Sequence, residues 1–129
     1  MISLMDLIQL YQDHVWGITV KGESIKNIPY ENIRTLKYEA DNLRPTIEVI
    51  KSKYATCLDY ALAVERLCGG KIYRIQHHSH AIARVGDLYT DFGECGVHLF
   101  HPQEIKDWGC KLIEITNLNP KHRNDIFTK

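Results

Sequence analysis

The sequence contains no apolar run that approaches the roughly 18 to 20 residues a helix needs to cross a bilayer. The apolar stretch in residues 1–16 is interrupted by Asp6, Gln9, Gln12 and Asp13 before it reaches the length of a secretory signal core. Sixteen basic and sixteen acidic side chains cancel, so the chain has no overall field that would attract nucleic acid or an anionic membrane. We therefore expect neither nucleic acid nor a membrane as a partner.

The chain is also poor in cysteine and lacks internal repeats, low-complexity tracts and a recognisable linker. Four cysteines in 129 residues are too few for a disulfide scaffold. A reducing, cytoplasmic setting is therefore the expectation. With 44% hydrophobic residues, a chain of this length can bury a core and still form a cleft. We expect one domain, residues 1–129.

The first half of the chain predicts helices. Apolar residues at helical spacing predict a first helix that ends near Trp16-Gly17, and a second that starts at Tyr30 and is interrupted or ended by Pro45. Residues 22–29 are predicted to form a loop. The segment from Thr46 to Ile50 fits either a short helix or a strand.

A third helix is the best-defined element in the sequence. Thr56 is a favourable N-cap residue, and Gly69-Gly70 permits the backbone conformation that ends a helix. The helix is therefore predicted from Cys57 to about Cys68. Its spacing predicts one buried stripe, formed by Cys57, Ala61, Val64 and Cys68.

After this helix the periodicity becomes that of strands. The predicted strands are Lys71 to Ile75, His80 to Val85, Leu88 to Phe92 and Lys111 to Thr116, with a short helix from Pro102 to Trp108 and a fraying tail from Asn117. The fold class predicted is α+β, with N-terminal helices and a Cys57-bearing helix packed on a small antiparallel sheet.

Gly86-Asp87 is a natural hairpin turn, and it sets the register of the two strands around it. With a two-residue turn, Val85 opposes Leu88, and His80 and Asp91 project on the same face as diagonal neighbours. A three-residue loop would send Asp91 to the far face, and a register slip could put Glu94 in its place.

Cys57, His80 and Asp91 together suit a thiol-based acyl-transfer site. A helix N-terminus and a neighbouring imidazolium both lower the pKa of a thiol, which makes it a better nucleophile. The roles predicted are attack by Cys57, proton transfer by His80 and orientation of the imidazole by Asp91. The Cys57 backbone N–H is a natural oxyanion donor, with Tyr54 or Ser52 as candidates for a second.

These segments resemble the transglutaminase-like proteins of the papain-like superfamily. The matching segments are Ala55-Thr56-Cys57-Leu58-Asp59-Tyr60-Ala61 for the nucleophile helix, Lys71 to Ile75 for the next strand, Ser79 to Val85 for the histidine strand and Leu88 to Asp91 for the aspartate strand. The resemblance implies a papain-like core. It also implies hydrolysis or transfer of an amide or related acyl group, as a peptidase, deamidase or transglutaminase-like enzyme, on a protein or peptide substrate without a cofactor.

The candidate site residues and their neighbours can also be interpreted as purely structural. A cysteine on an apolar helix face is usually a packed small hydrophobe, and Cys68, at the far end of the helix, is interpreted in that way. Asp59 is interpreted as structural, because a carboxylate is favourable in a first helical turn. Among the other histidines, His78 is the runner-up to His80 for the proton-transfer role.

Two other functions remain open on the sequence. The same fold could serve as a binding module without turnover. Cys95, His98 and His101 recur every third residue and could support a zinc site, although the spacing matches no established zinc motif and a loop there is the preferred interpretation. No metal is predicted.

Overall fold

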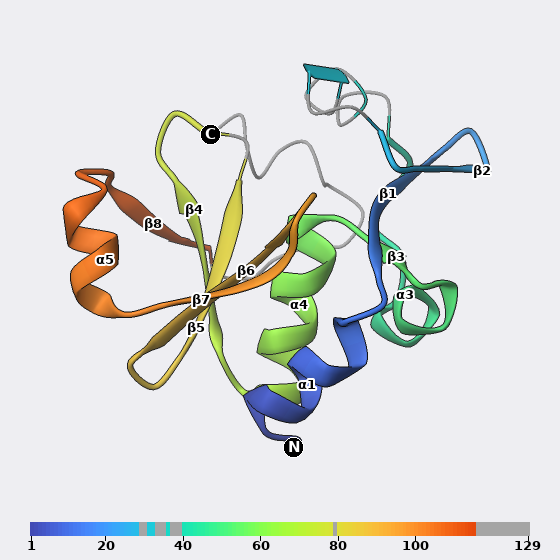
Figure 1. The fold of residues 1–129 in the computed structure, drawn as a ribbon. Coiled ribbons are helices and arrows are strands. Elements are labelled where there is room, and N and C mark those ends of the chain that lie inside the picture. Colours follow the sequence, from blue (N-terminus) through green and yellow to red (C-terminus); the bar gives the residue numbers. More distant parts are fainter. Residues whose placement is uncertain (29–30, 33–35, 37–39, 79, 116–129) are drawn as a thin grey trace.

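A computed structural model describes residues 1–28, 31–32, 36, 40–78 and 80–115 of the chain, and it confirms the α+β class. In this part of the chain the strands form a three-stranded sheet, in the order β2-β1-β3, and a five-stranded sheet, in the order β7-β6-β5-β4-β8. The elements are α1 (Leu4–Tyr11), β1 (Val15–Val20), β2 (Glu23–Lys26), α3 (Thr46–Ser52), β3 (Tyr54–Ala55), α4 (Cys57–Cys68), β4 (Lys71–Ile75), β5 (Ala81–Val85), β6 (Leu88–Gly93), β7 (Gly96–Phe100), α5 (Pro102–Asp107) and β8 (Leu112–Ile115). Helix α4 lies between the two sheets (Figure 1).

Helix α4 has the predicted bounds. The Thr56 side chain accepts a hydrogen bond from the backbone N–H of Asp59, and the Asp59 side chain accepts one from the backbone N–H of Thr56. At the other end Gly69 has a φ of +72°, a left-handed conformation that glycine adopts without steric cost. Burial is wider than the predicted single stripe, because all of residues 57–64 are buried. Helix α1, helix α3 and the five-stranded sheet all contact α4, so its first two turns are surrounded.

The hairpin between β5 and β6 has the predicted register. Val85 pairs with Leu88 and Ala83 with Thr90, which leaves Gly86-Asp87 as a two-residue turn. The two faces of this sheet belong to different cores. Ala83 joins the main cluster with α4, whereas Ile82 joins a second cluster with Ile105 of α5. The sheet is therefore covered by α4 on one face and α5 on the other.

The N-terminal segment differs from the prediction. The first helix stops at Tyr11, and the residues expected at its end form β1, where β-branched residues favour an extended chain. Part of the predicted 22–29 loop is β2, which pairs with β1 in an antiparallel hairpin. Lys21 and Gly22 turn this hairpin with φ values of 51° and 80°, the positive values that a tight two-residue turn requires.

The segment after Pro45, open between helix and strand, is helix α3. It ends at Lys53, which has a left-handed conformation, and the chain then enters β3, the parallel partner of β1. Of the helix predicted from Tyr30 up to Pro45, residues 31, 32 and 36 are helical, residues 40–44 are not, and the other positions lie outside the described residues, as does the tail from Asn117.

The region after the β5–β6 hairpin was predicted as a loop, and that prediction is wrong. Residues 96–100 form β7, which pairs with β6 along its length at the edge of the sheet. No residue of the strand is fully buried. Its sequence contains a single apolar–polar–apolar alternation, Val97-His98-Leu99, which is too short to mark a strand by periodicity. Helix α5 and strand β8 both lie within their predicted segments.

Candidate active site

Cys57 occupies the first position of α4, directly after the N-cap Thr56. The unpaired N–H groups of a helix start carry a partial positive charge that favours a thiolate over a thiol. Only 2% of the residue is exposed to solvent. Whether a substrate or reagent can reach the sulfur therefore depends on the side chains that pack around it.

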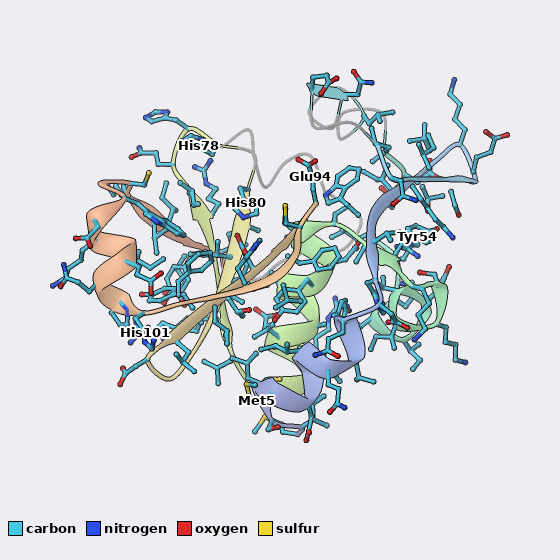
Figure 2. The ribbon with its side chains drawn as sticks, in the orientation of Figure 1. Met5, Tyr54, His78, His80, Glu94 and His101 are labelled. Atoms are coloured by element: carbon cyan, nitrogen blue, oxygen red, sulfur yellow. The ribbon has the colours of Figure 1, made fainter. Side chains whose placement is uncertain are left out.

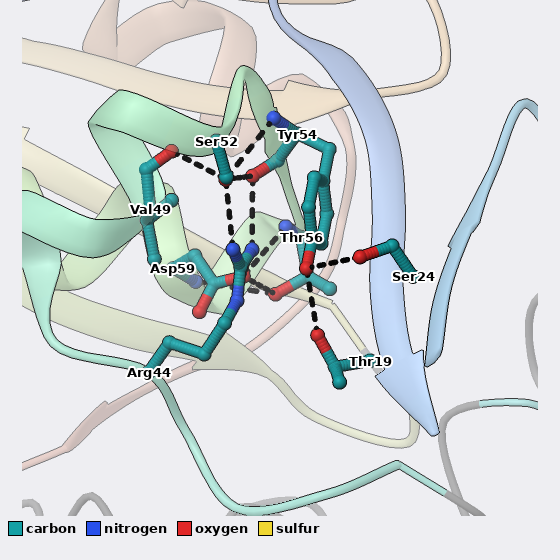
Figure 3. A network of polar contacts seen from close by, with 8 residues as sticks. All are labelled: Thr19, Ser24, Arg44, Val49, Ser52, Tyr54, Thr56 and Asp59. Atoms are coloured by element: carbon teal, nitrogen blue, oxygen red, sulfur yellow. Dashed lines mark hydrogen bonds and ion pairs between the residues drawn. The ribbon is translucent and has the colours of Figure 1, made fainter. Parts of the chain in front are cut away.

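A buried polar network fixes the chain just before Cys57 (Figure 3). The Arg44 guanidinium lies over the Tyr54 ring, 3.8 Å from the centroid, and donates hydrogen bonds to the Ser52 side chain and the Tyr54 carbonyl. The same guanidinium is 3.7 Å from the carboxylate of Asp59, which caps α4. Arg44 therefore ties the strand that enters the helix to the helix cap, and the structural interpretation of Asp59 is confirmed.

The two side chains considered for a second oxyanion donor belong to this network instead. The Tyr54 hydroxyl lies 2.8 Å from the hydroxyls of both Thr19 and Ser24. The Ser52 hydroxyl donates to the Val49 carbonyl at 2.7 Å and accepts from Arg44. Both hydroxyls are therefore engaged by neighbours within this network.

His80 lies one residue before β5, at the end of the sheet where α4 begins. Its backbone carbonyl accepts a hydrogen bond from the N–H of Ile75 at 3.1 Å, which continues the β4–β5 pairing. Its Nε2 lies 2.7 Å from Oδ2 of Asp91. The ring also makes a side-chain hydrogen bond with Cys57. The three residues predicted from sequence are therefore brought together.

The contacts of the His80 ring have opposing effects on its pKa. Burial lowers the pKa, but the hydrogen bonds with Asp91 and Cys57, together with the charges of these two groups, raise it to about 10. The folded protein therefore favours the imidazolium. Since the usual value is near 6.5, the resulting stabilisation is complete below about pH 6.5 and is lost as the pH rises through about 10.

This environment predicts a distinct titration. We expect the His80 ring to stay protonated in the folded protein at pH 8, whereas it titrates near 6.5 in the unfolded chain. Proton chemical shifts of the ring, followed against pH by NMR, measure this directly. His14 is an internal contrast, because burial lowers its pKa. A Cys57→Ala variant should lower the pKa of His80, and an unchanged value would contradict the assigned contact.

Asp91 contacts a second histidine that the sequence did not assign to this site. Its Oδ1 lies 3.0 Å from Nδ1 of His98, and Asp91 and His98 are direct partners in the β6–β7 pairing. The carboxylate is thus held between two imidazoles, with 12% of the Asp91 side chain exposed. A prediction of strand β7 beside β6 would have placed His98 opposite Asp91. The sequence analysis predicts a loop there, so this contact is missed.

The alternative site residues lie elsewhere. His78 is exposed in the turn after β4. Glu94 lies at the tip of the β6–β7 hairpin, at the same end of the molecule as His80 (Figure 2). The hairpin has the predicted register, and the carboxylate hydrogen-bonded to His80 is that of Asp91.

The residues considered for zinc do not converge. Cys95 and His101 lie at opposite ends of β7, and five extended residues span roughly 17 Å. Figure 2 places His101 far from Glu94, the chain neighbour of Cys95. His98, between them, contacts Asp91. Within the described ranges, no three His, Cys, Asp or Glu side chains are grouped to hold a metal ion.

Comparisons with protein-family models, curated proteins and solved structures gave no match to this chain. Within residues 1–28, 31–32, 36, 40–78 and 80–115, none of the helices has the length and apolar character needed to span a membrane.

Proposed function

We propose that this protein is a cysteine-dependent hydrolase or acyltransferase that acts on an amide or related acyl bond. The observation that carries the proposal is the position of the His80 ring, which is hydrogen-bonded to the Asp91 carboxylate and to the Cys57 thiol. A nucleophile, a base and an orienting group in contact are the requirement for this chemistry. The start of α4 adds a helix dipole behind the nucleophile.

The proposed mechanism follows from the ring nitrogen of His80 that Asp91 engages. Nε2 of His80 is engaged by Asp91, so Nδ1 is the nitrogen that takes the thiol proton. The Cys57 thiolate attacks the substrate carbonyl carbon and forms a tetrahedral oxyanion beside the first turn of α4, whose N–H groups stabilise negative charge. Collapse breaks the bond to the leaving group, which receives the proton from Nδ1. Water or an amine then attacks the thioester and releases Cys57.

The arrangement also supports a papain-like or transglutaminase-like core for this chain. The order of the elements is a nucleophile at the start of a helix, then a histidine at the start of one strand and an aspartate on the next strand. This is the order on which the resemblance in sequence rests. A protein or peptide is the substrate class that the resemblance implies, and no cofactor is needed for the proposed steps.

A second candidate, a binding module without turnover, is favoured by one observation. Cys57 is 2% exposed, which suits a packed small hydrophobe as well as a nucleophile. In the proposed enzyme, substrate reaches the sulfur past the His80 ring, whose side chain is 31% exposed. Reactivity toward a small electrophile distinguishes the two functions.

The test is the pH dependence of alkylation by iodoacetamide, measured for each cysteine by mass spectrometry of the native protein. A Cys57 held as a thiolate should react at a rate that changes less than about threefold between pH 6 and 8. The exposed Cys95 and Cys110 are alkylated in the same experiment as internal references. A small free thiol in solution with a pKa near 8.5 should react roughly 75-fold faster at pH 8 than at pH 6. We also expect Cys57 to be labelled first at pH 6.

The opposite outcome supports the binding module. In that case Cys57 stays unlabelled in the folded protein, or its rate follows the same pH profile as the rates of Cys95 and Cys110. Labelling of all four cysteines after unfolding in urea would show that the reagent was active in the same experiment.

A further inference from the structure

His98 makes contact with the proposed site without touching the nucleophile. The Asp91 carboxylate uses its two oxygens for two different histidines, Oδ2 for Nε2 of His80 at 2.7 Å and Oδ1 for Nδ1 of His98 at 3.0 Å. A carboxylate can only accept, so each ring nitrogen carries the hydrogen. The three side chains form a row across the adjacent strands β7 and β6 and the start of β5.

A chain of hydrogen bonds connects the backbone of His98 to helix α4. Its carbonyl accepts a hydrogen bond from the Thr90 hydroxyl at 2.8 Å. The Tyr60 hydroxyl lies 2.8 Å from the same Thr90 oxygen. The only hydroxyl hydrogen of Thr90 is donated to the His98 carbonyl, so in the other hydrogen bond the Tyr60 hydroxyl must donate to the Thr90 oxygen. The helix that begins with Cys57 is therefore linked through buried Tyr60 and Thr90 to the strand that carries His98.

The torsion that turns an aspartate carboxylate is broad, so packing alone does not fix which way its oxygens point. The hydrogen bond from His98 to Oδ1 restricts rotation of the Asp91 carboxylate and leaves Oδ2 directed at His80. We propose that His98 is a positioning residue of the site, which holds the Asp91 carboxylate in the orientation that engages His80. The inference rests on the proposed function and adds a fourth residue, outside the Cys57, His80 and Asp91 set, on which the reactivity of Cys57 depends.

Two kinds of variant separate a positioning role from a merely structural one. His98→Leu removes the donor, and His98→Ala is a second variant that does so. His98→Asn keeps an N–H near the position of Nδ1, since the asparagine amide is attached one carbon beyond Cβ, as Nδ1 is. Leu99→Ala, at the adjacent exposed residue of β7, is the control for disturbance of the strand.

Two readouts are measured on each full-length variant. The first is the NMR titration of the His80 ring, and the second is the rate of Cys57 alkylation by iodoacetamide at pH 6. His98→Leu and His98→Ala both remove a hydrogen bond to a charged carboxylate, which contributes more than a bond between neutral groups. We expect this loss to reduce the rate of Cys57 alkylation about tenfold. The pKa of His80 should fall in the same two variants. His98→Asn should restore both quantities to within about threefold of wild type, and Leu99→Ala should leave them unchanged.

Three results would count against this role or against the function beneath it. If His98→Leu and His98→Ala match wild type in both readouts, His98 positions nothing. If His98→Asn loses as much as they do, the imidazole itself is required, and positioning through one N–H is wrong. If wild-type Cys57 shows the pH profile of an ordinary thiol, the proposed function fails, while the His80 titration still reports whether His98 orients Asp91.

Discussion

Replacing Cys57 with alanine is expected to abolish acyl transfer while the fold stays intact. Loss of the nucleophile from a covalent mechanism should reduce turnover by at least about a thousandfold, to the background set by binding alone. A general probe of acyl transfer, such as p-nitrophenyl acetate, allows the measurement before the natural substrate is known. The rate of nitrophenolate release is compared between wild type and Cys57→Ala under identical conditions.

Stability is measured on the same variant, because Cys57 is also part of the core. Removing one sulfur atom from a buried position should cost about 1 kcal/mol, well below the change that unfolds a domain. Cys68→Ala is the matched control, since Cys68 is at the other end of α4, where burial raises the pKa of its thiol. That variant should keep wild-type turnover. Equal rates for wild type and Cys57→Ala would exclude Cys57 as the nucleophile and favour the binding module.

The part of the site that could be predicted from sequence depends on short-range signals. Helix α4 has a cap residue and a terminating glycine within its own sequence, and a two-residue turn joins β5 to β6. These local features fix the start of the helix and the hairpin register. His80 and Asp91 are only eleven residues apart, so their meeting follows from one turn. The contact with Cys57 needed the further assumption that α4 packs on this sheet.

The parts that could not be predicted depend on contacts between distant segments. Strand β1 pairs in parallel with β3, a two-residue strand that has no periodicity of its own. Tyr11 and Val15, four residues apart, suited a longer helix, and only pairing with β2 and β3 shows why the chain becomes extended. Strand β7 is an edge strand that exposes His98 and Leu99. His98 was therefore considered for zinc and not for Asp91.

The contact between Arg44 and Asp59 is another interaction between distant residues that sequence alone does not predict. The place of Asp59 in the first turn of a helix predicts a structural role, because a carboxylate there interacts favourably with the helix dipole. In the structure the residue is buried, and its carboxylate accepts from the backbone N–H and the hydroxyl of Thr56. Arg44 reaches the same carboxylate from the segment before α3. No sequence pattern predicts this partner, because the two residues are brought together only by the fold.

Replacing Asp59 with alanine should therefore be the most destabilising single change in this part of the molecule. The substitution removes the cap contact to Thr56 and leaves the Arg44 guanidinium, whose side chain is 10% exposed, without its carboxylate. Breaking a buried ion pair by deleting one partner typically costs about 3 to 5 kcal/mol. The free energy of unfolding, from urea denaturation followed by circular dichroism, measures the loss. Asp59→Asn keeps an oxygen for Thr56 and should lose less, which gives a measurable variant if the alanine form does not fold.

Asp87→Ala is the matched control for this prediction. Asp87 lies in the β5–β6 turn with 93% of its side chain exposed, 3.9 Å from Arg84, and an exposed ion pair of this kind contributes little to stability. A loss in Asp59→Ala no larger than that in Asp87→Ala would show that the network does not hold α4 in place. If the loss is large, it should be accompanied by slower alkylation of Cys57 in Asp59→Asn, because the cap that anchors the first turn of α4 also sets where the sulfur lies relative to His80.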